Sequence, residues 1–519
     1  MRFLTPLGLL LLSPLHATPP IEATVPPPIH QSLSRISPNA LKAHVSFLAS
    51  DVLEGRNTPS RGLEVAAEYI AAQFRRAGLE PIPGGDSYFQ IAPWVYKQIP
   101  LDGVKLQVRH GEQTLELDST HLSLQSLDSV DLANTPVFLA RIDDTDSLKS
   151  KPENHLAGKV ALALVPSMAQ IRGLPREERG ERMRVVSNLF SELRRLKPAF
   201  ILAVRNDSEQ GAGATGQLTD PSRPPSSRRS FFQASAVHSA KLAALLDPLP
   251  SGDTPAQLTL HLRAPVERPA PLKNVIGVLP GSDPQLKDSF ILITAHYDHI
   301  GATSPNEAGD GIYNGANDDA SGVASILEVA SAFAALPQRT KRTLIFMAMF
   351  GEEKGLLGAQ YYAAHPVFPL AKTIANVNLE HMGRTDATEG PQLNRLSPTG
   401  FGFTEVIDYF QLAGNLTGVE IFHHKENSEA FFPRSDNQAF ANFGVPAHTF
   451  CVAFEFPDYH GLGDHWEKID YNNMARVTGT VATAAWMMSE RPQPPEWHSL
   501  SQTEKYREAR QKEGNKSAQ

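Results

Sequence analysis

The second half of the chain alternates almost wholly apolar segments with helical ones. Segments such as ILITA (291–295) and TLIFMAM (343–349) contain hardly any polar side chain. A strand of this composition is buried on both faces. From residue 273 to residue 489, strands and helices follow each other in turn. This order predicts an α/β fold with a mixed, mostly parallel central sheet and helices on both faces, the last helix covering 474–489.

A chain of 519 residues has room for two or three domains. We expect the first part of the main domain at 35–101, where Ser37 can cap one helix and Gly78 can end the next. Short alternating segments at 102–265 predict a separate β-rich domain inserted into the main one. The main domain resumes at 266–489 and leaves 490–519 as a polar tail with at most a short helix.

The N-terminus has the features of a signal peptide. Residues 1–17 combine one positive charge with a short apolar run and then small residues. We expect cleavage near Ala17, a proline-rich linker at 18–34, and export to the periplasm or the extracellular space. The alternative is an apolar N-terminus that is not cleaved. No later stretch reaches about 18 consecutive apolar residues, so we expect no membrane span.

Composition excludes several classes of function. The net charge is −8 and no long block of Lys and Arg occurs, which argues against a nucleic-acid partner. Cys451 is the only cysteine, so no intrachain disulfide can form. It stands in the apolar stretch HTFCVAF and is expected to be a buried small residue. The oligomeric state is not determined by the sequence.

Histidines and carboxylates follow several of the predicted strands. In open α/β sheets, ligands bind at the carboxyl ends of the strands, so separate segments can meet at one site. His, Asp and Glu without Cys suit Zn²⁺ or a similar divalent ion. The segments are TAHYDH with His296 and Asp298, NGANDDASG with Asp318 and Asp319, FGEEKG with Glu352 and Glu353, NLEHMG with Glu380 and His381, and DYHGLGDH with His460 and His465.

Each of these residues also has a structural explanation. Either aspartate of the Asp318–Asp319 pair could cap the helix that follows. His296 alone would more readily be a core histidine, but Asp298 two residues later could orient its ring toward a metal. The adjacent glutamates are the hardest to explain structurally, because like charges repel and burial adds a desolvation cost. Two zinc ions would balance them.

Together these motifs resemble peptidase family M28, the di-zinc, aminopeptidase-like exopeptidases. ITAHYDHIG, YNGANDDASGVASILEVA, FGEEKGLLGAQYY, NLEHMGR and YHGLGDHWEKID occur in the order of the family's motifs. The opening HVSFLASDVLEGR also resembles exported bacterial members. The resemblance covers about 40–89 and 271–489. The inserted segment resembles the protease-associated (PA) domain of many members, through LAGKVALALVPS and PAFILAVRND.

The resemblance implies a role for each matching residue. Two Zn²⁺ per chain would be bound, one by His296, Asp318 and Glu380, the other by Asp318, Glu353 and His460. Glu352 would be the general base and Asp298 would orient His296. His381 would be structural, and His465 is the rival of His460. The expected substrate is a peptide with a free N-terminus. Relatives often have a cis peptide after the bridging aspartate, here Asp318–Asp319.

The chain departs from the family's commonest pattern in three places. Glu380 stands where aspartate is common, and its longer side chain still reaches a metal. Asn437 replaces a histidine of the SDH motif, which bears on hydrogen bonds to substrate. Residues 431–434 (FFPR) offer no tyrosine hydroxyl, so Arg434 is a candidate substrate contact together with Phe432 and Asp436. Candidate pocket walls, for which core packing is an equal alternative, are Phe431, Phe432, Phe443 and Phe450.

Three other functions fit the same motifs. A carboxypeptidase would use the same metals, with Arg434 or another cation binding the terminal carboxylate. A glutaminyl-cyclase-like transferase would bind one zinc ion. A non-catalytic, receptor-like binding protein would lack ligands or the base, and the sequence retains them all.

Overall fold

The computed structural model describes residues 25–33, 35–124, 128–167, 170–171, 173–207, 213–214, 216–221, 235–303, 305–388 and 390–517. The predicted signal peptide, and most of the loop that the sequence suggests at 221–230, lie outside these residues. The chain divides into two compact units, one formed by Met1–Ala92 with Leu272–Gln519 and the other by Pro93–Pro271.

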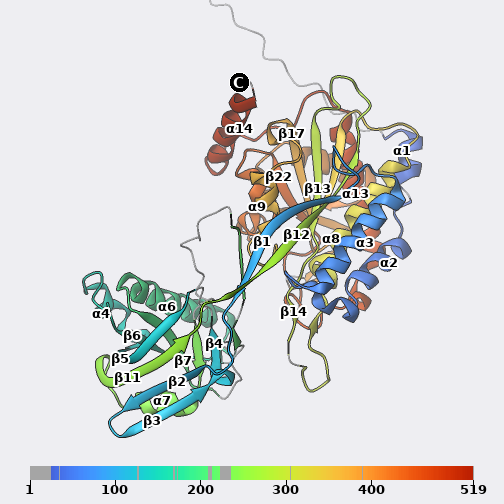
Figure 1. The fold of residues 1–519 in the computed structure, drawn as a ribbon. Helices are drawn as coiled ribbons and strands as arrows, with labels where there is room; N and C mark the ends of the chain where they lie inside the picture. The colour runs from blue at the N-terminus through green and yellow to red at the C-terminus, as the bar shows by residue number, and fades with distance from the viewer. Residues whose placement is uncertain are drawn as a thin grey trace, which may run out of the picture. The chain divides into compact units, whose positions relative to one another are not determined.

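The first unit is built on the predicted mixed sheet (Figure 1). Its four central strands, in the order β16, β13, β17, β22, are parallel, whereas β12 pairs antiparallel with β16 and β20 pairs antiparallel with β22. The strands in sheet order are β21 (Glu420–Ile421), β20 (Arg395–Pro398), β22 (Ala447–Cys451), β17 (Thr373–Leu379), β13 (Phe290–His296), β16 (Thr343–Met349), β12 (Val266–Leu279) and β1 (Phe89–Gln98).

Helices cover both faces of this sheet, as apolar strands require. On one face, Tyr362 and Phe440 pack against Leu292 and Met347 in a common core. On the other face, Phe74 and Leu79 lie against Gly277, where a side chain would collide with them. The α-helices are α1 (Pro27–Leu33), α2 (Pro38–Leu48), α3 (Arg61–Ala77), α8 (Ser321–Ala334), α9 (Leu357–Ala364), α10 (Val406–Thr417), α11 (Asn427–Ala430), α12 (Asn437–Ala441), α13 (Tyr471–Glu490) and α14 (Glu504–Ser517).

Local signals in the sequence set the first helices. The Ser37 side chain accepts a hydrogen bond from the backbone N–H of Ala40, and Pro38 is the first residue of α2. Gly78 ends α3 in the left-handed conformation, at φ 82°. Both features were predicted. The expected linker at 18–34, however, contains helix α1, whose Leu33 is buried.

The C-terminal segment differs from the expected polar tail. Helix α14 covers fourteen residues, and its Tyr506 stacks on Trp497 with ring centroids 4.9 Å apart. The Arg510 guanidinium donates to the backbone oxygens of Leu370 and Thr373. Two aromatic side chains and one arginine therefore attach a segment that is otherwise polar to the first unit.

The second unit is a β-rich body with its own core, as the sequence predicts. Its strands are β2 (Lys105–His110), β3 (Gln113–Asp118), β4 (Leu122–Leu124), β5 (Val130–Arg141), β6 (Val160–Val165), β7 (Phe200–Arg205), β8 (Gly213–Ala214), β9 (Gln217–Thr219), β10 (Ala236–His238) and β11 (Gly252–Leu262). Helices α4 (Thr145–Lys149), α6 (Arg176–Arg195) and α7 (Ala240–Leu246) complete it. The observed boundaries between the units fall inside β1 and β12, at Ala92–Pro93 and Pro271–Leu272, rather than at the predicted residues 101 and 266. The assignment of the second unit as a PA domain stays a prediction.

Candidate metal centre

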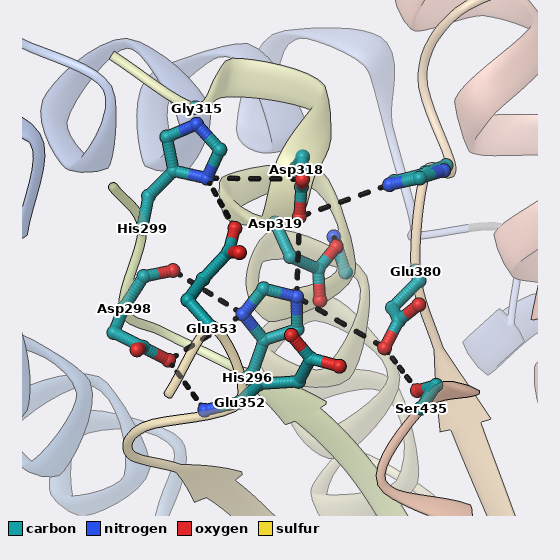
Figure 2. A network of polar contacts seen from close by, with 12 residues as sticks. His296, Asp298, His299, Gly315, Asp318, Asp319, Glu352, Glu353, Glu380 and Ser435 are labelled. Atoms are coloured by element: carbon teal, nitrogen blue, oxygen red, sulfur yellow. Dashed lines mark hydrogen bonds and ion pairs between the residues drawn. The ribbon is translucent and has the colours of Figure 1, made fainter. Parts of the chain in front are cut away.

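Four parallel strands bring the predicted site together at their carboxyl ends. Strand β13 ends at His296, which is paired with Met349 at the end of β16. Glu352 and Glu353 follow β16, and Glu380 follows β17. Asp318 comes from the turn that precedes α8. Figure 2 shows these side chains converging around His296 and Asp318.

The Asp318 carboxylate lies between two groups of donor atoms. Its Oδ1 is 3.2 Å from Nε2 of His296, and the same nitrogen is 3.9 Å from Oε1 of Glu380. Its Oδ2 is 3.2 Å from Nε2 of His460, which is 3.3 Å from Oε2 of Glu353. The two oxygens of one carboxylate thus face the two ligand sets that the resemblance implied.

His460, rather than its rival His465, belongs to this centre. His460 lies on the loop after β22 with a left-handed backbone at φ 53°. Nε2 of His465 lies instead 3.7 Å from Oδ2 of Asp310, on an exposed loop. The peptide bond between Asp318 and Asp319 is cis, as the resemblance implied. Asp319, which precedes the N-cap residue Ala320, accepts a hydrogen bond from the Gly322 N–H in the first turn of α8.

Asp298 positions two parts of the centre. Its Oδ1 accepts the backbone N–H of Glu352 at 3.1 Å, and its Oδ2 accepts the hydroxyl of Thr58 at 2.9 Å. The closest acceptor to Nδ1 of His296 is the backbone oxygen of Asp298 at 3.2 Å, while its carboxylate is 3.6 Å away. Asp298 therefore holds the Glu352 backbone at least as directly as it orients the His296 ring.

The two adjacent glutamates have opposite electrostatic environments. Burial raises the pKa of Glu352 well above its ordinary value, and Glu380, Asp436 and Glu353 add to this effect. Burial and Asp318 would also raise the pKa of Glu353, but contacts with His299 and His460 outweigh them and lower it to about 2. Glu353 is therefore ionised at neutral pH, whereas Glu352 can carry a proton.

The charges of the centre favour a bound cation. Burial would raise the pKa of Asp318, but His299 and His296 hold it well below the ordinary aspartate value. Burial would lower the pKa of His296, yet the carboxylates around it raise it well above the ordinary value. The Oε1 atom of Glu353 is buried and has no hydrogen-bond partner among the described residues. This cluster of carboxylates and imidazoles carries excess negative charge and offers the oxygen and nitrogen donors that Zn²⁺ binds.

A cavity of about 330 Å³ opens onto these residues. Of the predicted substrate residues, Arg434 lines it, and its guanidinium lies 4.0 Å from the centroid of the Phe431 ring, which also lines it. Phe432 was predicted to contact substrate but instead packs in the core near Phe403 and Trp497. Consecutive residues of the short helix at Phe432–Arg434 face different sides, so only part of this segment reaches the cavity.

The remaining predicted residues of this segment are buried. Asp436 is fully buried and does not line the cavity. Burial raises the pKa of its carboxyl well above the ordinary value, and Glu380 and Asp298 contribute. Asn437 donates to the Phe432 backbone oxygen and accepts from the Thr449 hydroxyl. It stabilises its own loop. Phe450 stacks on Phe410 and Phe443 packs against the core, so neither forms a wall of the cavity.

Tyr459 is a cavity residue that the sequence interpretation missed. No tyrosine hydroxyl was expected near the substrate, because residues 431–434 contain none. Tyr459 lines the cavity from another segment, with its ring centroid 4.2 Å from that of His460. Its position next to a proposed metal ligand was the available clue.

Arg56 was also missed, although the EGR motif was part of the resemblance. Its guanidinium is fully buried and donates to the backbone oxygens of Tyr297, Asn314 and Gly315, and of Leu48. Burial lowers the pKa of Arg56 to about 10, although four nearby aspartates partly oppose this shift. This residue links the N-terminal segment to the two loops that carry His296 and Asp318.

Residues 274–485 match the profile of peptidase family M28. A probable zinc metalloprotease of Pyrenophora tritici-repentis is 36% identical over 262 residues, which cover 44% of this chain and 59% of that protein. A probable zinc metalloprotease of Pyrenophora teres f. teres is 28% identical over 241 residues, covering 44% and 50%. The chain thus spans 50% and 59% of the length of these relatives.

Two solved structures have the same fold. The aminopeptidase from Aneurinibacillus sp. strain AM-1 aligns with a TM-score of 0.57 at 21% identity, covering 91% of this chain and 98% of that one. BSAP, a zinc aminopeptidase from Bacillus subtilis, aligns with a TM-score of 0.54 at 16% identity, covering 88% and 97%. These similarities establish the α/β fold. Among the described residues, no helix is long and apolar enough to cross a membrane.

Proposed function

This chain belongs to peptidase family M28, and we propose that it is a zinc-dependent aminopeptidase that removes N-terminal residues from peptides. The observation that carries the proposal is the Asp318 carboxylate, whose two oxygens each lie 3.2 Å from a histidine nitrogen of a separate donor group. A single carboxylate between two sets of ligands is suited to two neighbouring metal ions.

In this proposal His296, Asp318 and Glu380 hold one zinc ion, and Asp318, Glu353 and His460 hold the other. Bound zinc would lower the pKa of a water molecule and polarise the scissile carbonyl. Glu380 is fixed for its role by hydrogen bonds from the Ser435 hydroxyl and the Asn378 amide. The longer side chain of glutamate at this position is therefore held in place.

Glu352 is the proposed general base. It lines the cavity, and its backbone is fixed by Asp298. A carboxyl whose pKa is raised can accept a proton from the attacking water and return it to the leaving amine. Glu353 cannot replace it, because its carboxylate faces His299 and His460.

Tyr459 is the proposed hydrogen-bond donor to the oxyanion. Burial raises the pKa of its hydroxyl, and the nearby Asp318 and Glu353 raise it further. The group therefore keeps its proton and can donate it as a hydrogen bond when negative charge develops on the substrate oxygen.

A panel of substrates with free and blocked termini tests the activity. We expect release of amino acids from aminoacyl-arylamides, loss of activity in chelator, and recovery with Zn²⁺. Acetylation of the substrate N-terminus should abolish cleavage, whereas amidation of the C-terminus should not. A purified, metal-replete enzyme that cleaves N-blocked peptides and needs a free C-terminus would overturn the aminopeptidase assignment.

A carboxypeptidase is the second candidate, and Arg434 is the observation that favours it. The guanidinium lines the cavity and lies over the Phe431 ring, and no carboxylate among the described residues forms an ion pair with it. Such a cation could bind a terminal carboxylate. If so, Arg434→Ala would raise KM for peptides with a free C-terminus and leave their amides unaffected.

We further propose that the protein is exported, because residues 1–17 have the composition of a signal peptide. Sequencing the N-terminus of the protein recovered from the medium or the periplasm of its host tests this point. Recovery of a cytoplasmic protein that begins at Met1 would refute it.

A further inference from the structure

His299 stands three residues after His296 and has no role in the ligand sets above. It is fully buried, and its Nδ1 lies 2.9 Å from Oε1 of Glu353 and 3.8 Å from Oδ2 of Asp318. His299, Asp318 and Glu353 each present one donor atom, and all three atoms lie within 4.8 Å of one another. Figure 2 shows the His299 ring directed toward both carboxylates.

These atoms are close without being aligned for hydrogen bonding. Neither ring nitrogen of His299 nor Oε1 of Glu353 makes a hydrogen bond within the described parts of the chain. Buried polar atoms without partners are costly and rare in folded proteins. A cation placed between Nδ1 of His299 and the carboxylates of Asp318 and Glu353 would accept lone pairs from all three groups.

We propose that His299 is a fourth protein ligand of the metal ion held by Asp318, Glu353 and His460. Zinc–ligand bonds of about 2.0–2.1 Å in a tetrahedron place neighbouring donors about 3.3 Å apart. His460 Nε2 is 3.2 Å from Asp318 Oδ2 and 3.3 Å from Glu353 Oε2. The His299 distances of 2.9 and 3.8 Å bracket the same value.

This assignment makes the two metal sites unequal. The site with His299 has four protein donors, the number that structural zinc sites use. The other site has three, from His296, Asp318 and Glu380, the number that catalytic sites use. We therefore infer that the site with His299 binds its ion more tightly, and that the ion at His296 is the more readily exchanged. The inference rests on the proposed function, because it presumes a two-metal centre.

The surrounding backbone holds the His299 ring in place. The His299 N–H donates to the Arg56 backbone oxygen, and the Arg56 guanidinium donates to that of Gly315. A Cβ at Gly315 would lie 2.5 Å from Cγ of His299. Glycine at 315 is therefore required for the ring to occupy this position beside Glu353.

The test is metal binding by the full-length chain, measured without reference to turnover. We would compare His299→Ala, His299→Asn and His460→Ala for zinc content and for zinc affinity in competition with a chromophoric chelator. Partners that only orient a metal ligand contribute about 10–100-fold in affinity. We expect both His299 variants to weaken one of the two sites by at least about 100-fold, as His460→Ala does, and to change the electronic spectrum of the Co²⁺-substituted protein.

Two further measurements keep the outcome decisive. His465→Ala removes a partly buried histidine near the centre and should retain both ions. Thermal unfolding in chelator establishes whether the His299 variants fold. The inference is wrong, while the proposed function stands, if folded His299 variants lose less than about 100-fold in zinc affinity or keep the wild-type Co²⁺ spectrum. A wild-type chain that binds no zinc would overturn the proposed function itself.

Discussion

Glu352 and Glu353 are consecutive residues whose carboxyl groups have pKa values displaced in opposite directions. His299 and His460 hold Glu353 ionised, whereas burial and the neighbouring carboxyls raise the pKa of Glu352 and so make its carboxylate a stronger base. The proposed function uses this difference by assigning metal binding to Glu353 and proton exchange to Glu352.

The first prediction is unequal loss on neutralising the two glutamates. Glu352→Gln should lower kcat by about 10²–10⁴-fold, the usual contribution of a general base, and retain both zinc ions. Glu353→Gln should instead weaken zinc binding, because it removes a charged ligand. Turnover of an aminoacyl-arylamide and metal content by mass spectrometry distinguish the two variants. The matched control is Glu307→Gln, which neutralises an exposed glutamate. Full zinc occupancy in both Glu352→Gln and Glu353→Gln would disprove the assignment.

The second prediction concerns Tyr459. Tyr459→Phe removes only the hydroxyl, so we expect kcat to fall by about 10²–10³-fold, as for loss of one oxyanion donor. Zinc content and KM should change little. Tyr471→Phe is a suitable control, because its hydroxyl donates to the Trp466 backbone oxygen and it does not line the cavity. Unchanged kcat in Tyr459→Phe would exclude the hydroxyl from the reaction.

The sequence predicted the central sheet and the segments of the site well for a physical reason. Fully apolar strands leave few alternatives to a sheet covered on both faces. The polar residues at their carboxyl ends then meet wherever the strands are parallel neighbours, as β16, β13 and β17 are. His296, Glu353 and Glu380 needed no further information to be placed together.

The residues that were missed or misplaced depend on contacts that no local pattern encodes. Arg56 bonds the Tyr297 backbone across 241 positions of sequence. Phe431 and Phe432 are adjacent and chemically identical, yet one lines the cavity and the other is in the core. Phe432 is held in the core by ring contacts with Trp497 and Tyr506. Both of these residues belong to the C-terminal segment, which the sequence suggested was a polar tail.

The third prediction follows from the buried Arg56. Arg56→Ala would leave several buried carbonyl oxygens without a donor, so we expect a loss of at least about 3 kcal/mol in the free energy of unfolding. Arg56→Lys keeps the charge but has three donors on a single nitrogen, so it should recover only part of this loss. Urea unfolding in chelator separates the effect from metal binding.

The control for Arg56 is Arg61→Ala, which removes an exposed arginine at the start of α3 and should change stability by less than about 0.5 kcal/mol. Equal stability of Arg56→Ala and Arg61→Ala would show that the buried guanidinium does not hold the loops of the site together.

The last prediction is a pH dependence of stability due to His448. This fully buried residue donates Nδ1–H to the Thr399 backbone oxygen and accepts at Nε2 from the Thr404 hydroxyl. Burial lowers its pKa from 6.5 to about 4. Between these two values the unfolded chain binds a proton that the folded chain does not, so stability falls as the pH falls from 6.5 toward 4. The full effect is about 3 kcal/mol.

His448→Gln removes this titration. The variant should be less stable than the wild type at pH 7.5, because it loses the fit to both threonines, and this difference should shrink by up to about 3 kcal/mol as the pH approaches 4. Urea midpoints measured in chelator across this range provide the comparison, since the other histidines titrate alike in both proteins. The exposed His365→Gln should follow the wild type throughout. A difference between His448→Gln and wild type that does not vary with pH would show that His448 becomes charged in the folded protein as readily as in the unfolded one.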